Sequence, residues 1–190
     1  MNATESMPLK HGTPGGRRRS RWLGAVLVTL ATVTVALAWR GAGGPDRVDA
    51  DGLRRLPPAE RFDTLFARAM QASVTGAEVG PLAAAALATF PRIEDPDDDR
   101  RFHAAMLALY LRDDSTASKL AEALLASRPR HLLGLMVRVR VAERAQDRGA
   151  ADAAVAALLA GHWDELALPL PEYRDHREAI EAFLTALGRS

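Results

Sequence analysis

The feature that most constrains this chain is an apolar run from Trp22 to Trp39 that contains no charged residue. As a helix with about 1.5 Å of rise per residue it would be roughly 27 Å long, close to the hydrocarbon thickness of a bilayer. Trp22 and Trp39 end the run, where aromatic rings favour the headgroup level, and Arg21 and Arg40 lie just outside it. We therefore expect a transmembrane helix at residues 22–39, with these four residues at the membrane interface.

Basic residues are concentrated before this run, with Arg17, Arg18 and Arg19 in succession. Positively charged flanks stay in the cytoplasm, so we expect a single-pass protein of the inner (plasma) membrane with its C-terminal domain outside the cytoplasm. The segment Ala36-Leu37-Ala38 also has the A-x-A pattern of a signal-peptide cleavage site. A cleaved, exported form is therefore the alternative, and it places the domain on the same side.

The composition excludes several classes of site. The chain contains no cysteine, so disulfides, thiolate metal sites and cysteine nucleophiles are excluded. The formal net charge is +1, without the basic excess typical of a nucleic-acid-binding protein. Arginine greatly outnumbers lysine in an alanine-rich background, which indicates a GC-rich bacterial gene. Few aromatic residues and many alanines favour helix over sheet.

Four segments are expected along the chain. Residues 1–21 lack periodicity and are predicted to be a disordered basic segment in the cytoplasm. Residues 22–39 form the anchor, and residues 40–57, which contain Gly and Pro, form a linker. Residues 58–190 form an all-α domain, since apolar residues recur there at intervals of three and four.

Helix boundaries in this domain follow from Pro, Gly and Asp. We expect helices from Pro58, from Gly80 to about residue 90, from an Asp95 cap followed by Pro96, and from about Asp114. Three more are expected at about residues 131–147, at about residues 150–160 and at the C-terminus, the last ending at Gly188. A Pro-containing connection separates the last two.

Two columns of residues recur with one spacing. Ala83, Ala117 and Ala151 are separated by 34 residues each, and Phe90, Leu124 and Leu158 follow seven positions later. Thirty-four residues is the tetratricopeptide (TPR) period. Residues 58–160 thus resemble the TPR family, and this resemblance implies a solenoid of about three helical hairpins, followed by the terminal helix as a cap. The Trp, Leu-Gly and Tyr positions of the family's first helix are not filled, although Leu133-Gly134 lies out of register.

Candidate sites are few. Arg140, Arg144 and Arg148 recur every four residues and could bind an acidic peptide or a C-terminal carboxylate; alternatively they form a solvated face paired with acidic neighbours. The acidic stretch from Glu94 to Asp99 lacks calcium-loop spacing and is interpreted as a helix start. His162 and His176 lie near Asp164, Glu165 and Asp175 but without metal-ligand spacing, so they are interpreted as surface histidines. We expect no metal, no cofactor and no catalytic residue.

Three functions are compatible with these observations. The first is a non-enzymatic, membrane-tethered interaction or scaffold module that binds a protein or peptide partner of the cell envelope, and no nucleic acid. The second is a small helical enzyme or ligand-binding domain exported to the periplasm. The third is self-association through the anchor, where Ala25 and Thr29 form a small-x-x-x-small pair. The sequence favours the first.

Overall fold

The computed structural model of the chain describes residues 50–188. The predicted anchor with its interface residues, the basic segment before it and the cleavage motif lie outside the described residues, as do residues 40–49 of the predicted linker. Among the described residues, no helix combines the length and the apolar character needed to cross a membrane.

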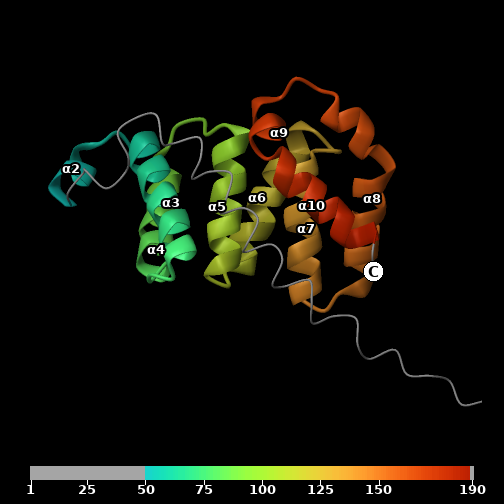
Figure 1. Cartoon of the computed structure of the whole chain (residues 1–190), viewed down its shortest axis with the longest axis horizontal. Coiled ribbons are helices and arrows are strands. Elements are labelled where there is room, and N and C mark those ends of the chain that lie inside the picture. Colours follow the sequence, from blue (N-terminus) through green and yellow to red (C-terminus); the bar gives the residue numbers. More distant parts are fainter. Residues whose placement is uncertain (1–49, 189–190) are drawn as a thin grey trace, which may run out of the picture.

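All regular secondary structure between residues 50 and 188 is helical, which confirms the predicted all-α class for this part of the chain. Figure 1 shows the helices before residue 167 in a row that follows the order of the sequence, whereas the last two helices lie back across this row. The helices are α2 (Ala50–Arg55), α3 (Pro58–Thr75), α4 (Gly80–Thr89), the 3-10 turn η3 (Phe90–Arg92), α5 (Asp98–Tyr110), α6 (Asp114–Ser127), α7 (Leu132–Arg144), α8 (Arg148–Leu166), α9 (Pro171–Asp175) and α10 (Arg177–Gly188).

Each helix from α3 to α8 packs on the next one in the sequence, so the hairpins α3–α4, α5–α6 and α7–α8 form one continuous stack. The hairpins α5–α6 and α7–α8 have turns of the same conformation. Arg112 in the first and Gln146 in the second both take positive φ angles, of 61° and 57°. The next residue in each turn, Asp113 or Asp147, caps the following helix and accepts a backbone N–H bond of 3.0 Å. Equivalent residues of these two turns are 34 positions apart in the sequence.

The first pair departs from this pattern. Helix α3 has 18 residues, whereas α5 and α7 have 13 each. It ends at Gly76, whose φ of 73° lies in the left-handed region that glycine adopts without strain. Helix α4 begins without a side-chain cap. The first hairpin therefore keeps the pairing but not the turn of the other two.

Small residues set the distance between α6 and α7. A Cβ atom on Gly134 would lie 3.0 Å from Leu124 Cβ, so a larger residue would push the two helices apart. In the 34-residue columns Ala83, Ala117, Leu124 and Leu158 are fully buried, while Ala151 and Phe90 are half-buried. Truncating either leucine to alanine should cost about 2–5 kcal/mol of stability.

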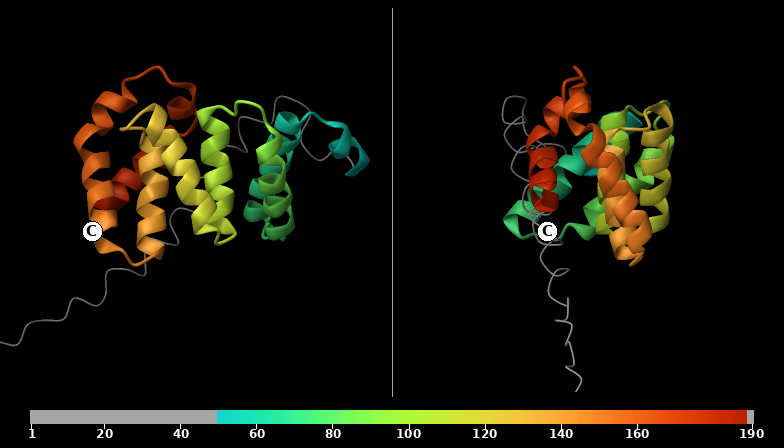
Figure 2. Two further views of the ribbon diagram at one scale, coloured as in Figure 1. Left: turned by 180° about the vertical axis from the view of Figure 1, so that it is seen from behind. Right: turned by 90° about the vertical axis from the view of Figure 1, so that its right-hand side faces the viewer.

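Helices α9 and α10 fold back over the hairpins. Helix α9 packs on α5, and α10 packs on α7. Figure 1 shows α10 crossing in front of α7, and from behind it lies on the far side of α7 and α8 (Figure 2). These two C-terminal elements bring residues beyond position 170 against the start of α5.

Several predicted boundaries were wrong. The cap of α5 is Asp97 rather than Asp95, because Asp95 lies in a bend with φ 47° and Pro96 precedes the helix. Helix α8 continues past residue 160 to Leu166, and at Gly161 it lies close to Arg130, whose Cδ would be 3.2 Å from an added Cβ.

Two short helices occupy segments predicted to be irregular. Helix α9 lies in the Pro-containing connection, where Pro171 suits its first turn. Helix α2 lies inside the predicted linker, where the Arg61 side chain binds the carbonyl oxygens of Leu53, Arg54 and Leu56 and so satisfies its C-terminal end.

Candidate functional site

The start of α5 carries three successive aspartates whose side chains have different partners. Asp97 caps the helix, accepting the backbone N–H of Arg100 at 2.8 Å, and also pairs with the Arg100 guanidinium at 2.7 Å. Asp98 and Asp99 instead point to two separate clusters that contain histidine, described below. Successive residues on a helix point in directions about 100° apart, so neighbours in sequence reach different surroundings.

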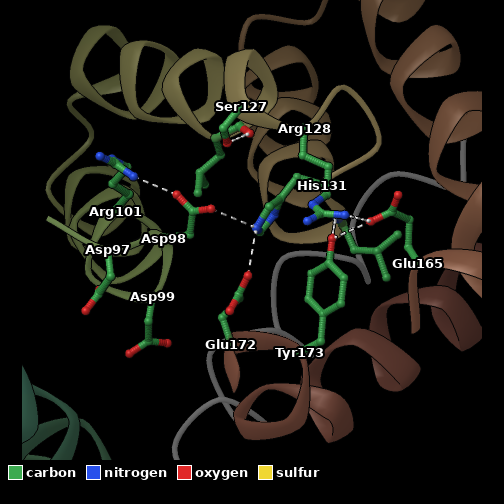
Figure 3. Close-up of polar contacts among 12 residues, drawn as sticks. Asp97, Asp98, Asp99, Arg101, Ser127, Arg128, His131, Glu165, Glu172 and Tyr173 are labelled. Carbon is green, nitrogen blue, oxygen red and sulfur yellow. Dashed lines mark hydrogen bonds and ion pairs between the residues drawn. The ribbon is translucent and has the colours of Figure 1, made fainter. Parts of the chain in front are cut away.

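The first group, here called the His131 cluster, consists of Asp98, His131 and Glu172. Figure 3 shows His131, the residue before α7, between the carboxylates of α5 and α9. Its Nε2 lies 3.7 Å from Asp98 Oδ2 and 3.4 Å from Glu172 Oε1. The imidazole is fully buried, and burial lowers its pKa below 6.5 although both carboxylates oppose this. The ring is therefore neutral at neutral pH.

Tyr173 fixes α9 beside this cluster. Its buried hydroxyl accepts the backbone N–H of Leu132, the first residue of α7, at 2.9 Å, and donates to Glu165 Oε2 of α8 at 3.0 Å. Burial raises the pKa of Tyr173, so the hydroxyl stays protonated and can donate. The tyrosine ring also contacts the His131 ring edge-on, with centroids 5.1 Å apart. One side chain thus links α7, α8 and α9.

The second group, here called the His176 cluster, consists of Asp99, His103 and His176. His176 Nε2 donates to Asp99 Oδ1 at 2.8 Å, and His103 Nδ1 lies 3.5 Å from Asp99 Oδ2. Burial lowers the pKa of His103 to about 3, so this ring is neutral. Burial alone would raise the pKa of Asp99, but the hydrogen bond from His176 leaves it lowered.

A small hollow lies next to the His176 cluster, between α3 and α5. Its volume is about 160 Å³. Arg100 lines the hollow and forms a bidentate ion pair with Asp63 of α3, with N–O distances of 3.0 and 2.7 Å. Phe66 stacks on His103, with ring centroids 3.8 Å apart. The lining residues are Asp63, Phe66, Ala67, Asp97, Asp99, Arg100 and His103.

The predicted arginine stripe is divided among different contacts. Arg140 pairs with Glu143 at 2.9 Å and lies over the Phe183 ring of α10, 5.0 Å from its centroid. Arg144 pairs with Asp114 of α6 at 3.0 Å and donates to the Leu109 carbonyl of α5. Arg148 is exposed at the start of α8. Arg140 and Arg144 thus join helices within the chain, and partner binding by the three arginines stays a prediction.

The interpretation of His176 as a surface residue was wrong, because it is 9% exposed and lies against Phe102. His162 contacts the Leu159 carbonyl of its own helix, so His162 and His176 do not lie in one site. His103 and His131 were not predicted as site residues from the sequence. The first could have been noticed because Asp99 and His103, four positions apart, share a helix face.

No protein-family model matches this sequence, and no significant match was found among curated proteins or solved structures.

Proposed function

We propose that this chain is a membrane-tethered, non-enzymatic interaction module of the bacterial cell envelope, with TPR-like hairpins that bind a protein or peptide partner. The hollow between α3 and α5 is the observation on which this rests. Ligand pockets for drug-sized molecules have volumes of about 300–1,000 Å³. A hollow of about 160 Å³ suits one side chain of a partner better than a cofactor or an enzyme's substrate.

The charge of the hollow indicates which side chain it would take. Asp63, Asp97 and Asp99 contribute three negative charges, Arg100 offsets one, and His103 is neutral. The Arg100 guanidinium is already occupied by two of these aspartates. The lining therefore favours a basic group, and we infer that a lysine or arginine of the partner inserts there, with its stem against Phe66.

The hairpin arrangement supports the same conclusion. Helices α9 and α10 pack on α5 and α7, whereas the residues that line the hollow all belong to α3, to α5 or to its cap Asp97. A partner segment that continues along α3 would meet this hollow without displacing the C-terminal helices. Tethering to a membrane would raise the local concentration of the module near other envelope proteins.

Binding can be tested with the full chain and an array of peptides that differ in one basic residue. Asp97→Asn keeps a good helix cap but removes one charge from the hollow. We expect Asp97→Asn to weaken the binding of basic peptides about three- to tenfold, and the difference in affinity should decrease in high salt. Asp147→Asn is the matched control, since it makes the same exchange at the cap of α8.

Equal binding by both variants would contradict a role for the hollow. Preferential binding of acidic peptides would favour the stripe of Arg140, Arg144 and Arg148 instead.

The tether has a separate test, because a chain without cysteine accepts a single reporter thiol. Ser6→Cys and Ala156→Cys place that thiol before the apolar run and on the exposed side of α8. With a membrane-impermeant reagent on intact spheroplasts, we expect labelling of Ala156→Cys alone. An intact mass that begins at Trp39 would show cleavage after Ala38 and would overturn the anchor.

A further inference from the structure

The three donor atoms of the His131 cluster have the spacing of metal ligands. His131 Nε2 lies 3.4 and 3.7 Å from the two carboxylate oxygens, and all three donor atoms lie within 4.8 Å of one another. A tetrahedral ion with bonds of about 2.1 Å holds neighbouring ligand atoms about 3.4 Å apart. A small shift of the carboxylates would therefore place all three atoms on one ion.

The Nε2 atom of His131 has no hydrogen-bond partner among the described residues. The side chain is fully buried, and neither ring nitrogen makes a hydrogen bond to any of the residues that the structure describes. Buried polar atoms are normally satisfied, so an unpartnered Nε2 that points between two carboxylates requires an explanation. The ring of His176, by contrast, is satisfied by its direct hydrogen bond to Asp99.

The carboxylates are oriented as metal ligands are. Asp98 Oδ1 is held by the Arg101 guanidinium at 2.7 Å, which leaves Oδ2 turned toward His131. Ligating carboxylates are commonly held in this way by a second hydrogen bond. With a neutral imidazole, the two carboxylates carry two negative charges, of which Arg101 offsets one. A divalent cation would compensate this remaining charge, with one positive charge in excess, and would give the unpartnered imidazole nitrogen a ligand bond.

We propose that His131 Nε2, Asp98 Oδ2 and Glu172 Oε1 bind a divalent transition-metal ion of the Zn²⁺ type. An imidazole ligand favours such ions over Mg²⁺ or Ca²⁺, which prefer oxygen ligands alone. Three protein ligands leave a position for water. Because the ligands come from α5, the residue before α7 and α9, the ion would hold the C-terminal segment against the hairpins. This inference does not depend on the proposed peptide binding.

The test uses the full chain purified in detergent, stripped with a chelator and titrated with Zn²⁺ alone against a chromogenic chelator. We expect one ion per chain, a higher unfolding temperature in its presence, and at least a tenfold weaker affinity in Glu172→Gln. Glu181→Gln, an exposed carboxylate on α10, is the matched control and should bind like the parent chain. Circular dichroism without metal reports whether each variant is folded.

If Glu172→Gln does not fold, Asp98→Asn takes its place, with the same expected loss of affinity. Absence of stoichiometric Zn²⁺ binding by the parent chain would overturn the proposal. Loss of binding in His176→Gln with retention in Glu172→Gln would overturn it as well, by assigning the ion to the other cluster.

Discussion

The His131 and His176 clusters begin at adjacent residues of α5 but are built differently. In the His176 cluster, Asp99 and His176 are joined directly by a 2.8 Å hydrogen bond, and the rings pack on Phe66 and Phe102. In the His131 cluster, the shortest distance from the imidazole to a carboxylate is 3.4 Å, and no hydrogen bond forms. Similar residue types therefore form a directly hydrogen-bonded, closed cluster around His176 and an open cluster around His131, in which the imidazole makes no hydrogen bond.

This comparison predicts that the closed cluster contributes more to stability. His176→Ala removes a buried ring and leaves Asp99 without its hydrogen bond, which should cost about 3 kcal/mol. Urea unfolding of the full chain in detergent, followed by circular dichroism, measures this change. A loss below about 1 kcal/mol, equal to that of the control Glu181→Gln, would contradict the structural role of the His176 cluster.

The second prediction concerns pH and uses the neutral His103 of the closed cluster. Its pKa is about 3 in the folded chain and 6.5 when unfolded, so the unfolded chain binds more protons below pH 6.5. Stability contributed by neutral His103 is present above pH 6.5 and is lost as the pH falls toward 3. Between pH 7 and pH 5 the loss should be about 2 kcal/mol, before Asp99, with its lowered pKa, begins to titrate.

Urea unfolding at both pH values measures this loss, and His103→Gln should reduce it. The lowered pKa of His131 acts in the same direction, so some dependence on pH should remain in that variant. An unchanged pH dependence in His103→Gln would contradict the assignment to this residue.

The smallest effect is expected in the open cluster. Without metal, Glu172→Gln removes a charge but breaks no hydrogen bond to His131, so the free energy of unfolding should change by less than about 1 kcal/mol. The same urea experiment, performed with a chelator present, compares it with His176→Ala. A loss as large as that of His176→Ala would show that the two clusters do not differ in the way the geometry indicates.

Several elements of the fold could be predicted from short-range patterns. Pro58, Gly80 and Asp114 begin α3, α4 and α6 where expected, because capping and the proline ring act within one turn. Where two candidate caps were close together, as with Asp95 and Asp97, the sequence did not distinguish them. That choice depended on the backbone of the preceding bend.

The candidate site was much less predictable. Asp97, Asp98 and Asp99 have the same local signal, an acidic helix start, and sequence reasoning assigned them one role. Asp97 pairs with Arg100 inside α5, whereas Asp98 faces His131 before α7, and the hydrogen bond between Asp99 and His176 at the end of α9 spans 77 positions. Nothing in the spacing of these residues predicts that α9 folds back on α5.

By itself, the sequence determined that the chain from residue 58 onward forms an all-α domain, that helices begin at particular proline and aspartate residues, and that a 34-residue spacing recurs. The first two properties follow from hydrogen bonds and side-chain periodicity within a few residues, and the third is read directly from the order of residues. Only the tertiary structure decided that His131 is buried between Asp98 and Glu172. The physical reason is that the burial and charge of a side chain depend on which distant helix packs over it, and that packing minimises the free energy of the whole domain.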